Sequence, residues 1–210
     1  MSESLRSAIE KGYDIQAEIV PNMVNFDAIP FANGDASSLL TIGNLLQVKG
    51  YNYLLEAFAK CLKESRLNLS IIGDGIEKER LATLSKELGI ENRINFIGAL
   101  SPKKLREEIH KYGIFISSSL YETFGVALVE ALGAGMPAVA TKCGGPEDII
   151  TSKNGRLAET ANAESLSNEI LYVYRNYKGF DRKSIRQDAI DRFGKETCIQ
   201  KMKQIIDGLN

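Results

Sequence analysis

The stretch from Ser119 to Pro137, SLYETFGVALVEALGAGMP, places one carboxylate, Glu130, in a segment that is otherwise apolar on every side. A helix that is apolar all round is a buried helix, so we expect a buried helix after Thr123. A buried carboxylate is rarely tolerated unless another group pairs with it. Glu130 is therefore either half of an ion pair in the core or a residue that binds a ligand.

A second carboxylate, Glu122, stands eight residues before Glu130 and just ahead of the expected helix. At ~1.5 Å per residue, the two carboxylates lie roughly 12 Å apart along the helix axis. The helix N-terminus between them attracts anions. Two hydroxyl-binding carboxylates on either side of an anion site suit a sugar, a diphosphate and a ribose in a row. The alternative is a charge at the helix N-terminus (Glu122) and a core ion pair (Glu130).

The rest of the chain alternates between short apolar runs and segments of helical periodicity. We expect strands at 18–20, 39–42, 67–72, 93–97, 114–117, 138–140 and 155–158. We expect helices at 4–11, 51–62, 76–88, 101–111, 147–150, 164–177, 182–192 and 195–208, besides the one after Thr123. This alternation predicts an α/β fold, a Rossmann-like parallel sheet sandwiched by helices. Residues 1–35 would be a lead-in from an interdomain region, 36–192 the Rossmann-like domain and 193–210 a C-terminal helix.

Parallel sheets bind ligands in the crevice beyond the carboxyl ends of their strands. The residues expected at those ends are Gly43, Gly73, Gly98, Ser118 and Thr141. Gly144-Gly145 is expected to form a flexible turn beside the crevice, either as pure turn chemistry or as a loop that opens toward a bound sugar. We therefore expect a binding crevice at this edge of the sheet.

One loop at this edge, from Gly43 to Gly50, carries a lysine, Lys49. Glycines allow the backbone to approach a ligand closely, and Lys49 supplies a mobile cation where phosphates would lie. A solvated lysine beside a turn glycine is the alternative. Tyr121 and Phe124, which flank the first carboxylate, offer an aromatic wall for a carbohydrate, although Phe124 also suits a core position.

Composition excludes several classes of protein. The 210 residues carry a net charge of −1, and the basic cluster around Arg106 is interleaved with acids, which indicates a solvated helix face rather than a nucleic-acid partner. Three widely spaced cysteines and a single histidine, His110, form neither a disulfide framework nor a metal site. With no signal peptide and no apolar run long enough to cross a membrane, we expect a cytoplasmic protein.

Several short motifs follow one another along the chain. They are Gly43-x-Leu-x4-Gly50, Gly73-Asp74-Gly75, Phe96-Ile97-Gly98, Glu122-Thr-Phe-Gly-x4-Glu130, Gly135-x-Pro137, Gly144-Gly145 and Asn154-Gly155. In this order and spacing they resemble the retaining group 1 (family 4) glycosyltransferases, which have the two-Rossmann GT-B fold. The Glu-x7-Glu element is specific, and the other motifs are weak singly. The chain resembles only the C-terminal, donor-binding half of such an enzyme.

The resemblance implies a role for each matching residue. Glu122 would contact hydroxyls of the transferred sugar and Lys49 would bind a phosphate, so these two are the expected catalytic residues. The expected donor-binding residues are Asn44, Gly73, Ile97, Thr123, Phe124, Gly125, Val126 and Glu130. Among these, the amides of residues 124–126 would meet the diphosphate, Glu130 would hold the ribose, and Gly73 and Ile97 would border the base. The family often carries Arg where this chain has Asn44. With Asn at this position, the leaving diphosphate would have one cation fewer beside it.

The function implied by the resemblance is transfer of a sugar from a nucleotide sugar, UDP- or GDP-linked, to an acceptor hydroxyl in polysaccharide or glycoconjugate biosynthesis. The acceptor, a glycan or a lipid-linked sugar, would bind mainly to a missing N-terminal domain, toward which the C-terminal helix would pack. The isolated chain is then expected to be inactive. No metal, cofactor or nucleic acid is expected, and the cytoplasmic location includes a peripheral position at the inner face of the membrane. Two alternatives stay open: a nucleotide-sugar binding module without catalysis, and another two-Rossmann enzyme such as a sugar epimerase or phosphorylase.

Overall fold

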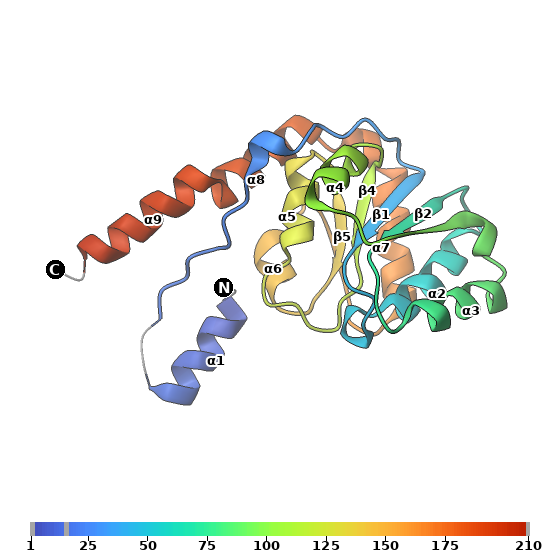
Figure 1. Cartoon of the computed structure of the whole chain (residues 1–210), viewed down its shortest axis with the longest axis horizontal. Helices are drawn as coiled ribbons and strands as arrows, with labels where there is room; N and C mark the ends of the chain where they lie inside the picture. Colours follow the sequence, from blue (N-terminus) through green and yellow to red (C-terminus); the bar gives the residue numbers. More distant parts are fainter. Residues whose placement is uncertain (1–2, 15–16, 209–210) are drawn as a thin grey trace.

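The computed structural model describes residues 3–14 and 17–208, and it has helices on both faces of one sheet (Figure 1). Within these residues, six strands form a parallel sheet in the order β3-β2-β1-β4-β5-β6. The strands are β1 (Ser38–Ile42), β2 (Asn68–Ile72), β3 (Ile94–Gly98), β4 (Ile114–Ser117), β5 (Ala138–Thr141) and β6 (Gly155–Ala158). The predicted Rossmann-like sheet sandwiched by helices is confirmed.

The expected helices are present, with small differences in their ends. They are α1 (Glu3–Tyr13), α2 (Tyr51–Cys61), α3 (Lys78–Glu87), α4 (Pro102–Ile109), α5 (Val126–Gly133), α6 (Gly145–Ile149), α7 (Ala163–Arg175), α8 (Arg182–Phe193) and α9 (Lys195–Asp207). Short 3-10 turns lie at Phe26–Ala28, Gln47–Lys49, Glu91–Arg93 and Tyr177–Gly179. Local chemistry sets the start of α4, because the Ser101 hydroxyl accepts a hydrogen bond from the Lys104 amide and Pro102 occupies the first turn.

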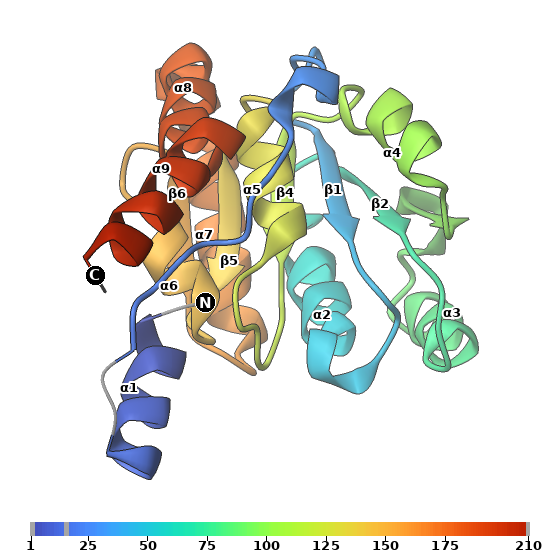
Figure 2. The same cartoon turned by 60° about the vertical axis from the view of Figure 1, so that its left-hand side comes forward.

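The core lies in two layers, one on each face of the sheet. Successive strand residues point to opposite faces, so Leu39 and Leu40 of β1 are both fully buried but belong to different layers. Leu39 packs with side chains of α2 and α7, whereas Leu40 packs with those of α5 and α8. Figure 2 shows α5 on one face of the sheet and α7 on the other.

The order of the strands reverses between β1 and β4. From β1 the chain adds β2 and β3 on one side, and from β4 it adds β5 and β6 on the other. At such a reversal the loops that leave the two strands diverge and open a crevice. Residues 43–50, which follow β1, and residues 118–125, which follow β4, therefore face each other.

Part of the expected lead-in packs into the domain. Phe26 and Ile29 are buried in the α5–α8 layer, and the Ala32 amide donates to the Ala134 carbonyl at 2.8 Å. The predicted strand at 18–20 is wrong, because these residues form no strand in the described part of the chain. The nearest pairing is an isolated bridge between Val24 and Gly194.

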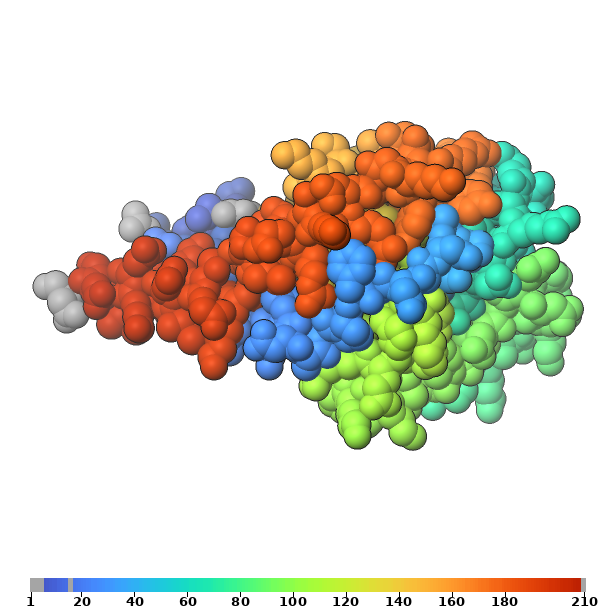
Figure 3. Space-filling model, turned by 90° about the horizontal axis from the view of Figure 1, so that it is seen from above, coloured from blue at the N-terminus to red at the C-terminus, as the bar shows by residue number. Residues whose placement is uncertain are grey.

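The last helix, α9, projects from the body of the protein (Figure 3). It carries a partly exposed apolar stripe, with 36% of Ile199, 43% of Met202 and 59% of Ile206 accessible to solvent. Cys198 on the same helix is buried. None of the helices in the described segments combines the length and the apolar character needed to cross a bilayer.

Candidate functional site

A cleft of about 320 Å³ opens where the strand order reverses. The ends of β1 and β4, the loop after β1 and the first turn of α5 line it. It brings together five of the residues expected at the site: Asn44, Lys49, Glu122, Gly125 and Val126. The predicted crevice at the carboxyl edge of the sheet is therefore present.

Two charged side chains meet in this cleft. The Lys49 Nζ lies 2.6 Å from Oε2 of Glu122, and the two side chains are 28% and 19% exposed. Among the described residues that line the cleft, Lys49 carries the only cationic side chain. The charges of Lys49 and Glu122 therefore offset each other, and the cation of the cleft is engaged by Glu122.

The backbone of Lys49 is held from the β4 side. The Ser118 hydroxyl donates to the Lys49 carbonyl at 2.9 Å, and the Leu120 amide donates to the Val48 carbonyl at 2.7 Å. The next residue, Gly50, has a left-handed backbone (φ 62°), and a Cβ there would lie 2.2 Å from the Ser118 carbonyl oxygen. Only glycine fits this close approach, so the loop that carries Lys49 is locked against the strand end that precedes Glu122.

Glu122 is held by the loop after β5. Its amide donates to the Cys143 carbonyl at 3.0 Å, and its carbonyl accepts from the Gly145 amide at 2.7 Å. A Cβ at Gly145 would lie 2.4 Å from the Phe124 carbonyl oxygen. The predicted flexible turn at Gly144-Gly145 is therefore tightly packed, and it fixes the position of Glu122.

The first turn of α5 offers hydrogen-bond donors to the cleft. The Gly125 carbonyl accepts the first helical bond, from the Val129 amide at 3.1 Å. The amides of residues 125–128 donate to no backbone carbonyl among the described residues. These amides and the helix dipole form an anion-binding end, and Gly125, Val126 and Leu128 all line the cleft.

Tyr51 is a site residue that sequence reasoning missed. It lines the cleft, and its hydroxyl donates to the Gly43 carbonyl at 3.1 Å, which ties the start of α2 to the end of β1. Burial raises the pKa of Tyr51 to about 12, so the hydroxyl stays protonated. Its place directly after Lys49-Gly50 was the available signal. Asn44, by contrast, is exposed and makes no side-chain hydrogen bond within the described residues.

Glu130 lies outside this cleft, in a second cavity of about 190 Å³ one turn further along α5. The cavity is lined by Ile29, Leu100, Pro102, Leu105, Arg106, Ile109 and Glu130. Burial raises the pKa of the Glu130 carboxyl, and the positive charge of Arg106 opposes part of the rise. Across the described residues the carboxylate accepts no hydrogen bond and forms no ion pair within 4.0 Å, so the core ion pair considered for it is not formed.

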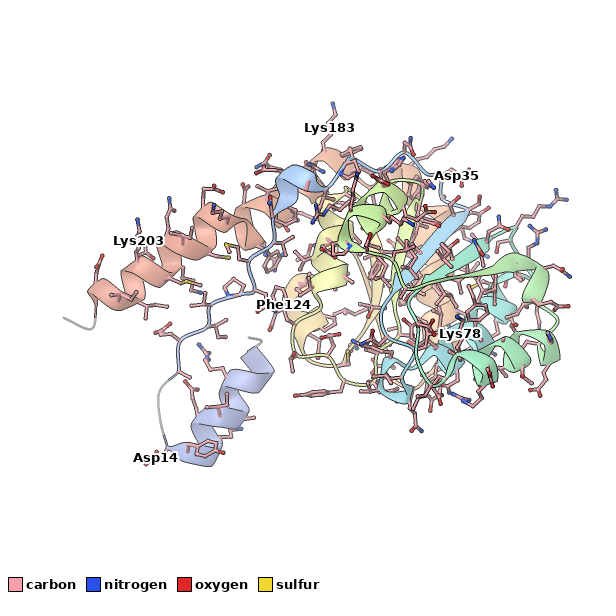
Figure 4. The ribbon with its side chains drawn as sticks, viewed as in Figure 1. Asp14, Asp35, Lys78, Phe124, Lys183 and Lys203 are labelled. Atoms are coloured by element: carbon pink, nitrogen blue, oxygen red, sulfur yellow. The ribbon has the colours of Figure 1, made fainter. Side chains whose placement is uncertain are left out.

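The other four expected donor-binding residues, Gly73, Ile97, Thr123 and Phe124, line neither of the two cavities. Gly73 packs on Gly43, whose carbonyl oxygen would lie 1.9 Å from a Cβ at position 73. Ile97 is half-buried in β3 and packs on the α5–α8 layer. Thr123 is exposed, and the Phe124 ring (Figure 4) lies edge-on to Phe193, with centroids 5.6 Å apart. The Phe124 side chain is therefore core, and only its backbone can serve the site.

Curated sequences are similar to this chain over most of its length. An uncharacterised glycosyltransferase of Methanocaldococcus jannaschii is 30% identical over 145 residues, which cover 69% of this chain and 37% of that protein. N-acetyl-alpha-D-glucosaminyl L-malate synthase of Bacillus anthracis is 27% identical over 171 residues, 80% of this chain and 44% of that enzyme. The chain thus spans less than half the length of either relative.

Solved structures share the fold. The lipopolysaccharide outer core galactosyltransferase WaaB superimposes with a TM-score of 0.87 at 24% identity, over 100% of this chain and 61% of WaaB. HepE from Anabaena, in complex with UDP and glucose, gives a TM-score of 0.85 at 21% identity over 98% of this chain and 61% of HepE. The sequence model of the group 1 glycosyl transferases matches residues 25–192. Because that match spans most of the chain, including both loops of the cleft, this protein belongs to the group 1 glycosyltransferases.

Proposed function

We propose that this chain is the donor-binding part of a retaining glycosyltransferase, which moves a sugar from a nucleotide sugar to an acceptor hydroxyl. The observation that carries the proposal is the contact between Lys49 and Glu122 at the open N-terminus of α5. A cation, a hydroxyl-accepting carboxylate and four amides that donate to no backbone carbonyl among the described residues suit a sugar diphosphate.

The donor would lie along one face of α5. Residues three or four apart share a helix face, so Val126 and Ala127 at the first cavity lead to Glu130 at the second. In this arrangement the diphosphate takes the amides at the helix N-terminus. The nucleoside enters the second cavity, where the Glu130 carboxylate accepts hydrogen bonds from the ribose hydroxyls.

Donor binding would rearrange the charged pair. Lys49 turns from Glu122 toward the diphosphate, and Glu122 then accepts hydrogen bonds from the sugar. During transfer the acceptor hydroxyl oxygen bonds to the anomeric carbon as the bond from the sugar to the diphosphate breaks, and the hydroxyl proton passes to the leaving diphosphate. Negative charge grows on the leaving oxygen, and the turned Lys49 and the amides of α5 stabilise it. Glu122 orients the sugar and forms no bond to it, and the retaining outcome rests on the resemblance of the motifs.

The acceptor would be a glycan or a lipid-linked sugar of polysaccharide or glycoconjugate biosynthesis, held mainly by a preceding domain. The relatives, which are about twice as long as this chain, support this division. The exposed stripe of α9 (Ile199, Met202, Ile206) would pack toward that domain. All three cysteines are buried free thiols, which suits the proposed cytoplasmic location, with or without a peripheral position at the membrane.

A binding module without catalysis is the second candidate. The single cation among the described lining residues of the cleft favours it, because Asn44 stands where the family often has Arg. A measurement of sugar transfer decides between the two in the full-length protein. The isolated chain is expected to bind its donor weakly and to transfer nothing.

Calorimetric titration tests the donor site directly. The chain is titrated with UDP, GDP, ADP and CMP and then with the matching nucleotide sugars, alongside Glu130→Ala and Glu122→Gln. We expect one class of nucleotide to bind most tightly, Glu130→Ala to weaken every nucleotide that binds, and Glu122→Gln to weaken only the sugar-bearing ligands. If no nucleotide binds and Glu130→Ala changes only the stability of the fold, the donor site is refuted.

A further inference from the structure

The second cavity combines apolar walls with two charged groups of opposite sign. Leu100 and Pro102 precede α4, Leu105 and Ile109 lie on it, and all four line the cavity. The two charges are Glu130 on α5 and Arg106 on α4. Apolar walls with a few convergent polar groups are the usual form of a small-molecule site, and flat apolar walls suit the faces of a heteroaromatic ring.

The two charged groups are close enough to interact but do not pair. No ion pair within 4.0 Å joins the Arg106 guanidinium to the Glu130 carboxylate in the described part of the chain, although the charge of Arg106 acts on the Glu130 carboxyl. Arg106 is exposed on one side, and its guanidinium has donors left for a ligand. An arginine that served only to neutralise Glu130 would be expected to contact it.

Arginine and glutamate bind ligand groups of opposite hydrogen-bonding character. A carboxylate accepts hydrogen bonds from the hydroxyls of a ribose, whereas a guanidinium only donates. Among the bases, uracil and guanine present carbonyl oxygens as acceptors, while cytosine and adenine present amino groups as donors at the corresponding positions. With Glu130 on the ribose, Arg106 on the facing helix would meet the edge of the base.

We propose that Arg106 sets the base specificity of the donor, favouring a nucleotide whose base carries a carbonyl oxygen (uracil or guanine) over one that carries an amino group there (cytosine or adenine). The proposal rests on the proposed function, because it assumes that the nucleoside occupies the cavity of Glu130. Arg106 acts on binding alone and takes no part in the transfer. The acidic residues beside it on α4 do not change this preference, because Glu107 and Glu108 do not line the cavity.

Two matched pairs of ligands test the proposal: UDP against CDP, and GDP against ADP. The members of each pair have the same ring size and differ in the carbonyl or amino group and in the protonation of the adjacent ring nitrogen, and guanine also carries a 2-amino group that adenine lacks. Calorimetry of the wild-type chain is expected to show at least about tenfold tighter binding of the carbonyl member of at least one pair. Arg106→Met should bring that ratio close to one, chiefly by weakening the carbonyl ligand.

Three further variants make the outcome specific. Lys103→Met removes a cation from the same helix outside the cavity and should keep the ratio. Glu130→Gln should weaken all four nucleotides and also keep the ratio. Arg106→Lys keeps the charge without the planar fork of donors, and it stands in for Arg106→Met if thermal unfolding shows that the latter does not fold.

The different failures point to different conclusions. If no nucleotide binds the wild-type chain, the proposed donor site falls and the role of Arg106 falls with it. If nucleotides bind and Glu130→Gln weakens them, the donor site stands. In that case, two results overturn the role of Arg106 alone. One is a wild-type chain that binds both members of each pair equally, and the other is an Arg106→Met variant that retains the full affinity ratio.

Discussion

The Nζ of Lys49 lies 2.6 Å from Oε2 of Glu122 at the mouth of the cleft. The two residues are 73 positions apart in the sequence, and two loops bring them together: one locked by Gly50 against the end of β4, the other held by the loop after β5. Because each charge satisfies the other, an incoming anion competes with Glu122 for Lys49. The pair is therefore expected to lower the affinity of the cleft for a bare nucleotide.

Removing the competing carboxylate should strengthen the binding of a bare nucleotide. A partly exposed ion pair is worth up to about 1 kcal/mol, so Glu122→Gln is expected to bind UDP or GDP about fivefold more tightly than the wild type. Lys49→Met should weaken the same nucleotide by about tenfold or more, since it removes a charge-assisted hydrogen bond. Calorimetry of both variants measures this, and weaker binding of the bare nucleotide by Glu122→Gln would contradict the competition.

A second cation in the cleft should strengthen nucleotide binding at position 44, where this chain has Asn and the family often has Arg. Asn44 lines the cleft and is exposed, so Asn44→Arg adds a donor with charge where the diphosphate is proposed to lie. The expected gain is about tenfold in nucleotide affinity, with a steeper loss of affinity as salt is raised. Asn52→Arg, on α2 outside the cleft, is the control for a general effect of charge. Equal gains from the two variants would show that Asn44 is not at the phosphate site.

The sheet could be predicted from the sequence because its strands are short, mostly apolar runs, three of which (β1, β2 and β3) end at or just before a glycine. Ile114–Ser117 and Gly155–Ala158 have the predicted bounds. Prediction failed at 18–20, where a strand-like run forms no strand within the described residues. Pairing is a property of the folded chain, and the local pattern does not contain it.

The sequence predicts which loops form the site but not which of their side chains touch. The motifs placed Lys49 and Glu122 at one edge of the sheet, but their direct contact depends on how Gly50 and Gly145 pack against distant carbonyl groups. Arg106 was not singled out for a similar reason. In the sequence it belongs to a basic cluster that is typical of a solvated face, and only the folded chain shows that it lines one cavity with Glu130.

The close approach at Gly50 predicts a large loss of stability on substitution. Gly50→Ala places a Cβ 2.2 Å from the Ser118 carbonyl oxygen on a left-handed backbone, φ 62°. We expect the free energy of unfolding to fall by about 3 kcal/mol or more. Gly89 is a matched control, because it has φ 67° and a Cβ added there would meet no atom within 4 Å. Gly89→Ala carries the backbone cost alone, about 1 kcal/mol, and denaturant unfolding of both variants isolates the clash.

The Glu130 carboxyl predicts how stability depends on pH. Burial raises its pKa in the folded protein above the value in the unfolded chain. The unfolded chain therefore releases this proton first as pH rises, and the stability that the protonated group contributes is lost between the ordinary and the raised pKa. Glu130→Gln, which stays neutral, should match the wild type at acid pH and become the more stable protein above that window. Thermal unfolding from pH 4 to pH 8 measures the difference.

Glu87→Gln, at an exposed position on α3, is the control and should have the same pH dependence of stability as the wild type. If the stability of Glu130→Gln runs parallel to that of the wild type across this range, burial of the Glu130 carboxylate carries no cost in stability.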